Sequence, residues 1–311
     1  MPLILLSLAD DELDEYRPAI AAACAALGID ATLTTRADDP AAVDYVVLTP
    51  AGPVADFAPF TGLKAALSLW AGVERIVGNP TLTAPLCRMV DAGLLEGMLD
   101  YVTGHVLRHH LDLDTFITGQ DGIWRGDRVA PLARERVVGM LGLGALGAAC
   151  ARALAGLNFE VCGWSRRPAR IEGVACHHGA EGLEAVLRRA QILVTLLPAT
   201  PQTENILDAR RLALLPRGAV IVNPGRGTLI DDAALLAALD AGAVGHATLD
   251  VFRTEPLPPA HPYWAHPRVT VTPHVAAPSR AGTAAAVIAE NVRRAEAGEA
   301  LLYRVDRAAG Y

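Results

Sequence analysis

The chain has 311 residues, which is long for one hydrophobic core, so its length predicts two domains. Its composition, 52% hydrophobic and 20% charged, is typical of an ordinary soluble globular protein. A formal net charge of −7 gives no general attraction to nucleic acid or to an anionic membrane surface, and no apolar run reaches membrane-spanning length. Five scattered cysteines favour reduced thiols and a cytoplasmic protein over a disulfide framework.

Lysine is almost absent, because Lys64 is the only one. This excludes the Gly-Lys-Ser/Thr phosphate loop and the Tyr-x-x-x-Lys pair of short-chain dehydrogenases. The run Cys176-His177-His178 invites a metal site, but metal sites usually show spaced ligand pairs and adjacent side chains rarely converge on one ion. We therefore expect no metal.

The first hundred residues alternate short apolar runs with alanine-rich stretches of helical periodicity. The chain starts without a basic secretory leader and reads directly as a strand. This alternation predicts a parallel sheet with crossover helices. The expected strands are Pro2–Leu8, Ile29–Leu33, Tyr45–Thr49 and Ala65–Trp70, and the expected helices are Asp11–Leu27, which stops at Gly28, and Met89–His110.

A second unit begins at a buried-strand pattern, Arg136–Leu141, which runs directly into a glycine-rich loop. Strands and helices then alternate through a complete doubly wound α/β domain. The further strands expected are Glu160–Trp164, Ile192–Leu197, Ala219–Asn223, His246–Val251 and Val269–Thr272, and the helices are Ala148–Gly156, Leu183–Ala190, Asp208–Leu214, Asp232–Ala241 and a final Ser279–Ala297.

The glycine loop matches the G-x-G-x-x-G fingerprint of dinucleotide-binding domains, and it follows a strand and opens a helix as that fingerprint requires. Gly142 permits the tight turn, Gly144 lets the backbone approach a pyrophosphate, and Gly147 lets helix pack on strand. Ala145 and Leu146 place backbone N–H groups at the helix N-terminus, which favours an anion.

The end of the second strand of this unit discriminates between the two nicotinamide dinucleotides. NAD sites place a carboxylate there for the ribose 2′-hydroxyl. Here the residues are Ser165, Arg166 and Arg167, and arginines can pair with a 2′-phosphate bidentately. We expect NADP, with NADPH preferred and NAD as the lesser alternative; solvated turn arginines are the competing interpretation.

Three polar residues follow strands of the second unit, at the edge where doubly wound sheets bind ligands. Arg226 lies in Asn-Pro-Gly-Arg-Gly, Glu255 in Thr-Glu-Pro, and His274 ends Val-Thr-Pro-His. Together they supply a cation for an anionic substrate, a proton donor and a carboxylate that orients the donor. They predict hydride transfer to a small acid.

With these motifs the chain resembles the D-isomer-specific 2-hydroxyacid dehydrogenase family, and within it the glyoxylate/hydroxypyruvate reductase A type. The resemblance covers nearly the whole second unit. It rests on the glycine loop and on Leu197-Pro198 with Thr200–Thr203, Asn223–Gly227, Leu249–Pro259, His266–His274, Trp164–Arg166 and Val305–Tyr311.

The resemblance implies a role for each matched residue. Arg226 would bind the substrate, His274 would be the general acid, and Glu255 would fix its tautomer. The backbone of Ala71, Gly72 and Val73 would grip the substrate carboxylate. Further cofactor contacts are implied at Leu197, Pro198, Thr203, Pro224, Gly225 and Asp250.

The resemblance also implies the architecture: two doubly wound parallel-sheet domains, with a Rossmann cofactor domain inserted into a flavodoxin-like substrate domain. Residues 1–100 with 279–311 would form the substrate-side domain and 101–278 the dinucleotide-binding domain. Substrate would lie in a cleft closed by hinge motion, and the protein would be a homodimer.

The expected activity is NADPH-dependent reduction of small 2-keto acids such as glyoxylate and hydroxypyruvate. A bulkier 2-keto acid is the alternative substrate, and a dinucleotide-sensing interaction protein is a less favoured alternative of another class. Trp70 stands where related sequences usually have a small residue. Its ring would either crowd the mouth of the substrate pocket or be buried beside it, and we expect burial because an aromatic at a strand end usually packs.

Overall fold

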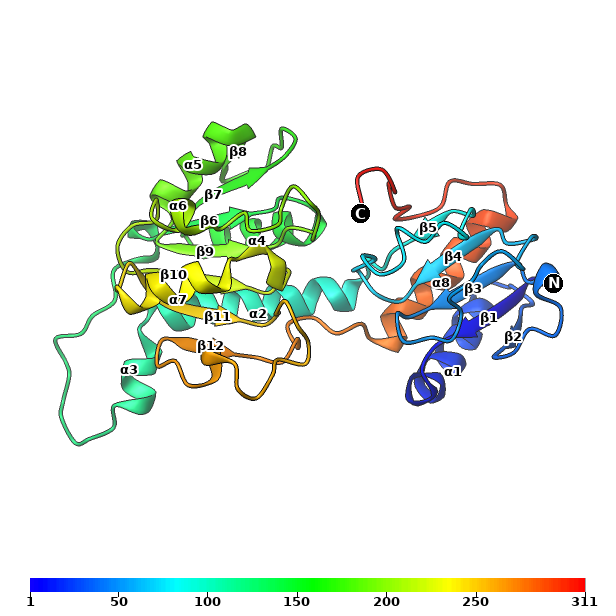
Figure 1. Ribbon diagram of the computed structural model, residues 1–311, viewed down its shortest axis with the longest axis horizontal. Helices are drawn as coiled ribbons and strands as arrows, with labels where there is room; N and C mark the ends of the chain where they lie inside the picture. The colour runs from blue at the N-terminus through cyan, green and yellow to red at the C-terminus, as the bar shows by residue number, and fades with distance from the viewer. Residues whose placement is uncertain (311) are drawn as a thin grey trace. The chain divides into compact units, whose positions relative to one another are not determined.

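The computed structural model describes residues 1–310 and divides the chain into two compact units (Figure 1). Unit 1 comprises Met1–Leu94 and the segment from Ser279 onward, and unit 2 comprises Leu95–Pro278. The division falls inside helix α2 (Ala92–His110), a few residues before the position near residue 100 that the sequence suggested. Tyr311, at the end of the motif Val305–Tyr311, lies outside the described residues.

Unit 1 is built on a five-stranded parallel sheet of order β2-β1-β3-β4-β5, the flavodoxin-like order. Its strands are β1 (Leu3–Ser7), β2 (Thr32–Thr34), β3 (Tyr45–Leu48), β4 (Ala65–Ser68) and β5 (Leu86–Cys87). All residues of β3 and β4 are buried, as expected of parallel strands covered on both faces.

Two helices from opposite ends of the chain, α1 (Asp10–Ala26) and α8 (Ala281–Glu296), cover one face of this sheet. Ile20 of α1 and Ile288 of α8 pack with the strands in one apolar cluster. Glu296, in the last turn of α8, accepts hydrogen bonds from Tyr45 (2.5 Å) and Lys64 (2.7 Å). Loops and the one-turn helix η1 (Pro40–Ala42) complete the unit.

Unit 2 has a seven-stranded parallel sheet of order β12-β11-β10-β9-β6-β7-β8, which is the Rossmann order with one strand added. The chain reverses its direction of winding between β6 and β9. The strands are β6 (Val137–Leu141), β7 (Glu160–Ser165), β8 (Val174–His178), β9 (Ile192–Thr195), β10 (Ala219–Asn223), β11 (Val244–Leu249) and β12 (Val269–Val271).

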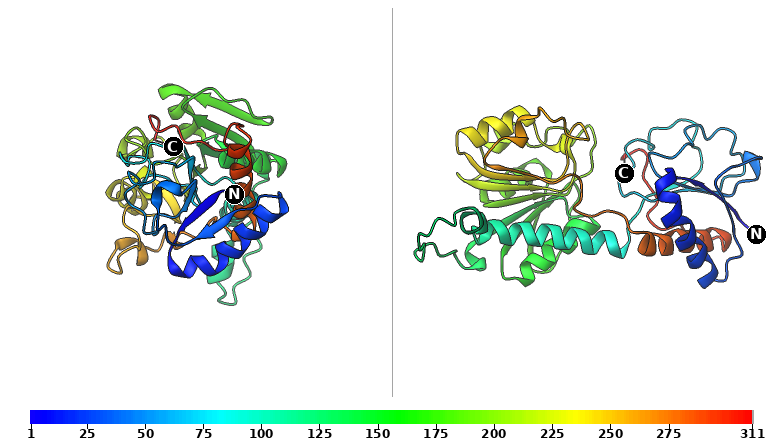
Figure 2. Two further views of the ribbon diagram at one scale, coloured as in Figure 1. Left: turned by 90° about the vertical axis from the view of Figure 1, so that its right-hand side faces the viewer. Right: turned by 90° about the horizontal axis from the view of Figure 1, so that it is seen from below.

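Helices cover both faces of the unit 2 sheet, so the expected α/β class with two doubly wound sheets is confirmed. Helices α2 and α4 (Ala145–Gly156) pack on one face, and α5 (Gly179–Arg189) and α7 (Asp232–Asp240) on the other, as Figure 2 shows for α2 and α7. The short elements are α3 (Leu113–Thr118), α6 (Ala209–Leu212), η2 (Ala133–Glu135), η3 (Gly227–Leu229) and η4 (Pro262–Trp264).

Several expected boundaries were wrong, and two strands and one α-helix were missed, besides the one-turn helices η1–η4. Helix α2 begins at Ala92 instead of Met89, because Asp91 Oδ1 accepts a hydrogen bond from Leu94 N and caps it. The missed strands are β5 and β8, and the missed α-helix is α3. Strand β8 includes Cys176-His177-His178 and is held by backbone pairing to β7; within residues 1–310 no group of three metal-ligating side chains is present.

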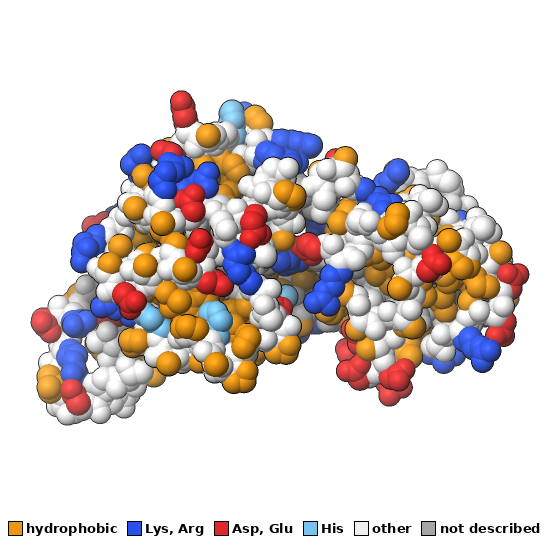
Figure 3. All heavy atoms as spheres, viewed as in Figure 1, with side chains coloured by type: hydrophobic (Ala, Val, Ile, Leu, Met, Phe, Trp, Pro, Cys, Tyr) orange, Lys and Arg blue, Asp and Glu red, His pale blue; other side chains and the backbone are white. Residues whose placement is uncertain are grey.

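Basic and acidic side chains are interspersed over the face drawn in Figure 3. No helix among the described residues combines the length and hydropathy needed to cross a membrane.

Candidate active site

The loop after β6 requires glycine for its backbone geometry at two motif positions, Gly142 and Gly147. Gly142 has φ +105°, and its N–H donates to Trp164 O at 2.8 Å. A Cβ on Gly147 would lie 1.9 Å from the Gly142 carbonyl oxygen, so helix α4 can pack on the loop only without a side chain there. A Cβ on Gly144 would meet no atom within 4 Å. The open space at Gly144 and the unpaired N–H groups of the first turn of α4 fit a pyrophosphate.

The end of β7 presents the two arginines expected to select the cofactor. Ser165 Oγ donates to Arg167 O at 2.7 Å, and Trp164 Nε1 donates to Gly179 O at 2.7 Å, so the turn is held from both sides. Arg166 and Arg167 are exposed, and the turn contains no carboxylate. This charge arrangement suits a phosphate better than a ribose hydroxyl pair.

The loop after β9 is closed by a threonine. Thr203 Oγ1 donates to Pro198 O at 2.7 Å and accepts from Thr200 N at 2.9 Å. Leu197 is buried at 8% exposure. The three predicted cofactor residues Leu197, Pro198 and Thr203 thus belong to one ordered turn at the point where the sheet reverses its winding.

Asn223, which the sequence interpretation did not single out, fixes the loop after β10. Its side chain is 1% exposed; Oδ1 accepts from Thr195 Oγ1 at 2.7 Å and from Gly225 N at 3.1 Å, while Nδ2 donates to Arg226 O at 3.0 Å. The loop Pro224–Arg226 is therefore tied to two strands. A buried polar residue closing an apolar strand was the available signal.

Arg226 is half-buried and directs one guanidinium nitrogen, Nη1, to the carbonyl oxygen of Gly225 at 2.7 Å. The next residue must be glycine, because a Cβ on Gly227 would lie 2.0 Å from the carbonyl carbon of Phe252. The Arg226 loop is therefore packed directly on the segment that leads to Glu255.

Asp250, after β11, organises the turn that contains His274. It is fully buried, and its Oδ1 accepts from Thr272 Oγ1 (2.6 Å) and Val275 N (2.9 Å), its Oδ2 from Ala276 N (3.0 Å), and its backbone oxygen from His274 N (2.8 Å). These bonds give Asp250 a structural role. Its contact with the nicotinamide stays a prediction.

His274 and Glu255 form a hydrogen-bonded pair. His274 Nδ1 lies 2.7 Å from Glu255 Oε2, and Glu255 Oε1 accepts from Phe252 N at 2.8 Å. The His274 side chain is 52% exposed, and its backbone is left-handed at φ +54°. Because Glu255 holds Nδ1, Nε2 is the ring nitrogen available to a reacting molecule.

The pair is electrostatically coupled to Arg226. The hydrogen bond to Glu255 raises the pKa of His274 above its ordinary value, although burial and the Arg226 charge act in the opposite direction. Burial alone would raise the pKa of Glu255, but hydrogen bonds from His274 and Phe252 N–H outweigh it and lower that pKa. An ionised carboxylate beside an imidazole that readily takes up a proton is a general-acid arrangement.

The remaining predicted site residues, Ala71, Gly72 and Val73, lie in unit 1 after β4, whereas all the others belong to unit 2. Val73 is buried at 3% exposure, and its oxygen accepts from Ile76 N at 2.9 Å. Within the described chain, the backbone N–H groups of Ala71, Gly72 and Val73 donate no hydrogen bond. Successive donors of this kind suit a carboxylate.

The expectation that Trp70 is buried was wrong, because it is 42% exposed. Its neighbour Leu69 is fully buried and belongs to the apolar cluster of unit 1, which does not include Trp70. The Trp70 backbone is fixed: N donates to Ser68 Oγ at 3.1 Å and the oxygen accepts from Met89 N at 3.0 Å. A large ring is therefore held at the surface beside the Ala71–Val73 segment.

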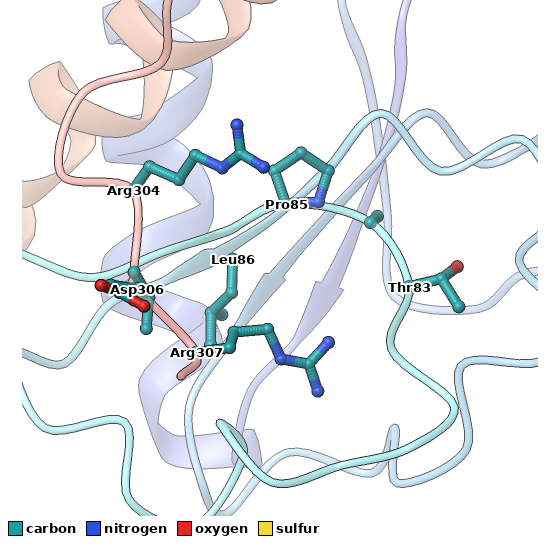
Figure 4. Close-up of a pocket in the computed structure, with 8 residues that line it drawn as sticks. Thr83, Pro85, Leu86, Arg304, Asp306 and Arg307 are labelled. Carbon is teal, nitrogen blue, oxygen red and sulfur yellow. The ribbon is translucent and has the colours of Figure 1, made fainter. Parts of the chain in front are cut away.

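Unit 1 has a surface pocket of about 460 Å³, and none of its lining residues is a predicted site residue. Figure 4 shows the residues that line it. Arg307 reaches from it to the carbonyl oxygens of Val77, Asn79 and Leu82, so the C-terminal segment braces the chain that follows Val73. The pocket is lined by Thr83, Ala84, Pro85, Leu86, Arg304, Val305, Asp306 and Arg307.

Comparison with known proteins agrees with this geometry. Residues 103–276 match the family model described as D-isomer specific 2-hydroxyacid dehydrogenase, NAD binding domain. The chain is 40% identical over 258 residues to the glyoxylate/hydroxypyruvate reductase A of Yersinia enterocolitica, covering 80% of this chain and 82% of that one. The chain belongs to the D-isomer-specific 2-hydroxyacid dehydrogenase family.

Solved structures of the family extend the match over the full length. A D-isomer-specific 2-hydroxyacid dehydrogenase from Xanthobacter autotrophicus, in complex with NADPH and MES, is 42% identical with a TM-score of 0.91, covering 100% of this chain and 99% of that one. The NADPH-dependent glyoxylate/hydroxypyruvate reductase of Sinorhizobium meliloti, in complex with NADP and sulfate, is 35% identical with a TM-score of 0.88 and full coverage of both chains. This dehydrogenase is therefore an NAD(P)-dependent oxidoreductase that interconverts 2-hydroxy and 2-keto acids.

Proposed function

We propose that this dehydrogenase uses NADPH to reduce small 2-keto acids, with glyoxylate and hydroxypyruvate as substrates. The observation that supports it best is the His274–Glu255 hydrogen bond at 2.7 Å, electrostatically coupled to Arg226, at the edge of the sheet where the glycine loop lies. Relatives named glyoxylate/hydroxypyruvate reductase at 35–40% identity support the substrate class.

In the proposed reaction Arg226 binds the carboxylate and carbonyl oxygen of the 2-keto acid, which polarises the ketone. His274 donates the proton on Nε2 to the developing alkoxide. The Nδ1 proton stays on the ring and is donated in a hydrogen bond to Glu255, which holds the ring in one orientation and stabilises its cationic form. Backbone N–H groups of Ala71–Val73, which belong to unit 1, would donate to the substrate carboxylate, whereas all the proposed dinucleotide-binding residues belong to unit 2.

The nicotinamide supplies the hydride when the dinucleotide is bound. Residues Gly142–Gly147 would hold its pyrophosphate, and the turn Pro198–Thr203 and the loop Pro224–Gly225 would line its path along the sheet edge. Arg166 and Arg167 would pair with the 2′-phosphate. Two family members solved with NADPH or NADP support this cofactor, with NAD as the lesser alternative.

Substituting Arg166→Asp is expected to reduce the preference for NADPH over NADH by about 10- to 100-fold, as expected for losing a hydrogen bond to a charged group. The ratio of kcat/KM for the two cofactors is the measurement. Arg170→Asp is the matched control, because Arg170 is exposed on the same segment and the charge change is identical. A ratio unchanged in Arg166→Asp, or changed equally in Arg170→Asp, would remove this arginine from phosphate recognition.

We also propose that a second copy of this chain covers the segment that follows α2. Exposed apolar side chains gather there, with Ile117 at 65%, Ile123 at 67%, Trp124 at 94% and Val129 at 83% exposure. Such a set on a loop points to a protein partner, and a symmetric dimer is the commonest assembly. Sedimentation at micromolar concentration is expected to give a dimer, and a monomer there would reject the proposal.

A panel of 2-keto acids tests the function, with NADPH oxidation followed at 340 nm and glyoxylate, hydroxypyruvate, 2-ketoisocaproate and phenylpyruvate as substrates. The highest kcat/KM is expected for the two small acids, because the exposed Trp70 ring beside Ala71–Val73 leaves less room for a long side chain. A clear preference for the branched or aromatic acids would establish the bulkier-substrate alternative. NADPH binding without turnover of any acid would support a dinucleotide-sensing protein.

A further inference from the structure

Helix α2 lies beside strands β11 and β12 in unit 2 (Figure 1), and a seam of polar side chains joins the helix to these strands and to Thr272 after β12. On α2, Tyr101, His105, Arg108 and His109 recur at the spacing that normally forms an apolar stripe facing a core. Here the stripe meets threonines instead: Arg108 Nη2 donates to Thr270 Oγ1 at 2.9 Å, and His109 Nε2 lies 2.8 Å from Thr248 Oγ1.

The end of this seam touches the segment that contains His274. Tyr101 Oη lies 2.7 Å from Thr272 Oγ1, and the Thr272 hydroxyl donates its single proton to Asp250 Oδ1 at 2.6 Å. Tyr101 must therefore be the donor in the first bond. Burial raises the pKa of Tyr101, so its hydroxyl keeps the proton that this direction requires.

The Asp250 carboxylate, which Thr272 holds in place, is hydrogen-bonded to the backbone next to His274. Its carboxylate accepts from Val275 N and Ala276 N, and its backbone oxygen accepts from His274 N. His274 adopts φ +54°, a left-handed conformation that is unfavourable for a residue with a Cβ. The left-handed turn is therefore imposed by its hydrogen bonds and not by local preference.

We propose that Tyr101 and Thr272 are positioning residues, which act through Asp250 to hold the left-handed turn that directs the His274 imidazole at the substrate. This rests on the proposed role of His274. Neither residue touches the reacting atoms. Their contribution is orientation, and a small misplacement of a catalytic group can lower a rate by about 100-fold.

The test compares isosteric substitutions along the seam. Thr272→Val and Tyr101→Phe are expected to lower kcat by about 10-fold while leaving NADPH affinity unchanged. Thr272→Ser keeps the hydroxyl group and should have the kcat of the unmodified protein. Thr248→Val is the matched control: it removes one buried hydroxyl from the same seam, opposite His109, but has no bond to the His274 turn. It should lower the melting temperature about as much as Thr272→Val and leave kcat unaltered.

A second readout does not depend on turnover. The His274 ring is titrated by ¹⁵N NMR, with its resonance assigned from the spectrum of His274→Asn. The groups that face it are Glu255, Arg226 and Asp250. In Thr272→Val the pKa of His274 is expected to fall toward its ordinary value, because a loosened turn weakens the bond to Glu255.

If Thr272→Val and Tyr101→Phe match Thr248→Val in both kcat and the His274 titration, the proposal is overturned. A wild-type protein that reduces no 2-keto acid would reject the proposed function. In that case the titration alone still decides whether Thr272 and Tyr101 hold His274.

Discussion

His274→Asn is expected to lower kcat/KM for 2-keto acid reduction by about 10²- to 10⁴-fold, the usual contribution of a positioned general acid. The asparagine amide is smaller than the imidazole ring and can still donate a hydrogen bond to Glu255. It cannot transfer a proton to the substrate at neutral pH. The side chain is 52% exposed, so the fold and NADPH affinity should be retained. Stopped-flow measurement of hydride transfer and fluorescence titration with NADPH separate the two effects.

The expected pH dependence of the reduction follows from the raised pKa of His274. The reductive reaction needs the protonated ring, so kcat/KM should be constant below the pKa of His274 and fall about tenfold per pH unit above it. Because the bond to Glu255 raises that pKa, the decline should begin above the ordinary value for histidine. In Glu255→Gln the decline is expected at lower pH.

His266→Asn is a control for both experiments, because His266 lies near the sheet end and faces Asp240 at 3.3 Å but has no proposed role. Its rate and pH profile should equal those of the unmodified protein. A flat profile in the unmodified protein, with hydride transfer shown to limit the rate, would exclude His274 as the acid.

The second large effect concerns Gly144 and Gly147, two glycines of the same fingerprint. Gly147→Ala places a Cβ 1.9 Å from the backbone oxygen of Gly142, so the loop or α4 must shift, and we expect both a lowered melting temperature and loss of most NADPH affinity. Gly144→Ala meets no atom within 4 Å, so stability should be unchanged. Its Cβ would nevertheless occupy the space assigned to the pyrophosphate, and NADPH affinity should fall by about 100-fold or more.

Calorimetry without ligand and isothermal titration with NADPH test this pair. Gly156→Ala serves as a neutral substitution, since that position lies at the far end of α4 with open space around it. The assignment of the loop would be wrong if Gly144→Ala bound NADPH like the unmodified protein.

The unit 2 fold and the grouping of its site residues could be predicted from the sequence. The fold follows from the alternation of strands and helices, and the grouping follows from the position of each residue after a strand. Arg226, Glu255 and His274 each follow a strand, and parallel strands place their carboxyl ends at one edge of the sheet. The glycine fingerprint identified the carboxyl end of β6, which lies at the same edge. No tertiary information was needed for either inference.

Features that depend on a specific neighbour could not be anticipated. The polar stripe of α2 suggests a solvated face, yet Tyr101 and His109 lie against threonines of the sheet. Strand β8 shows no clear alternation and exists through its pairing with β7. Trp70 was expected to be buried because an aromatic ring usually packs, but it is its neighbour Leu69 that enters the core and Trp70 stays exposed.

Unit 1 is assembled from the two ends of the chain, and this has a consequence for biosynthesis. The apolar face that α1 and β1–β4 present is completed by Ala284, Ile288 and Val292 of α8, which are synthesised only after unit 2. Unit 2 is continuous and can fold as soon as it is synthesised. Strands β1–β4 are synthesised before unit 2 and keep an uncovered apolar surface until α8 has been made, so this part of unit 1 is exposed to aggregation throughout the synthesis of unit 2.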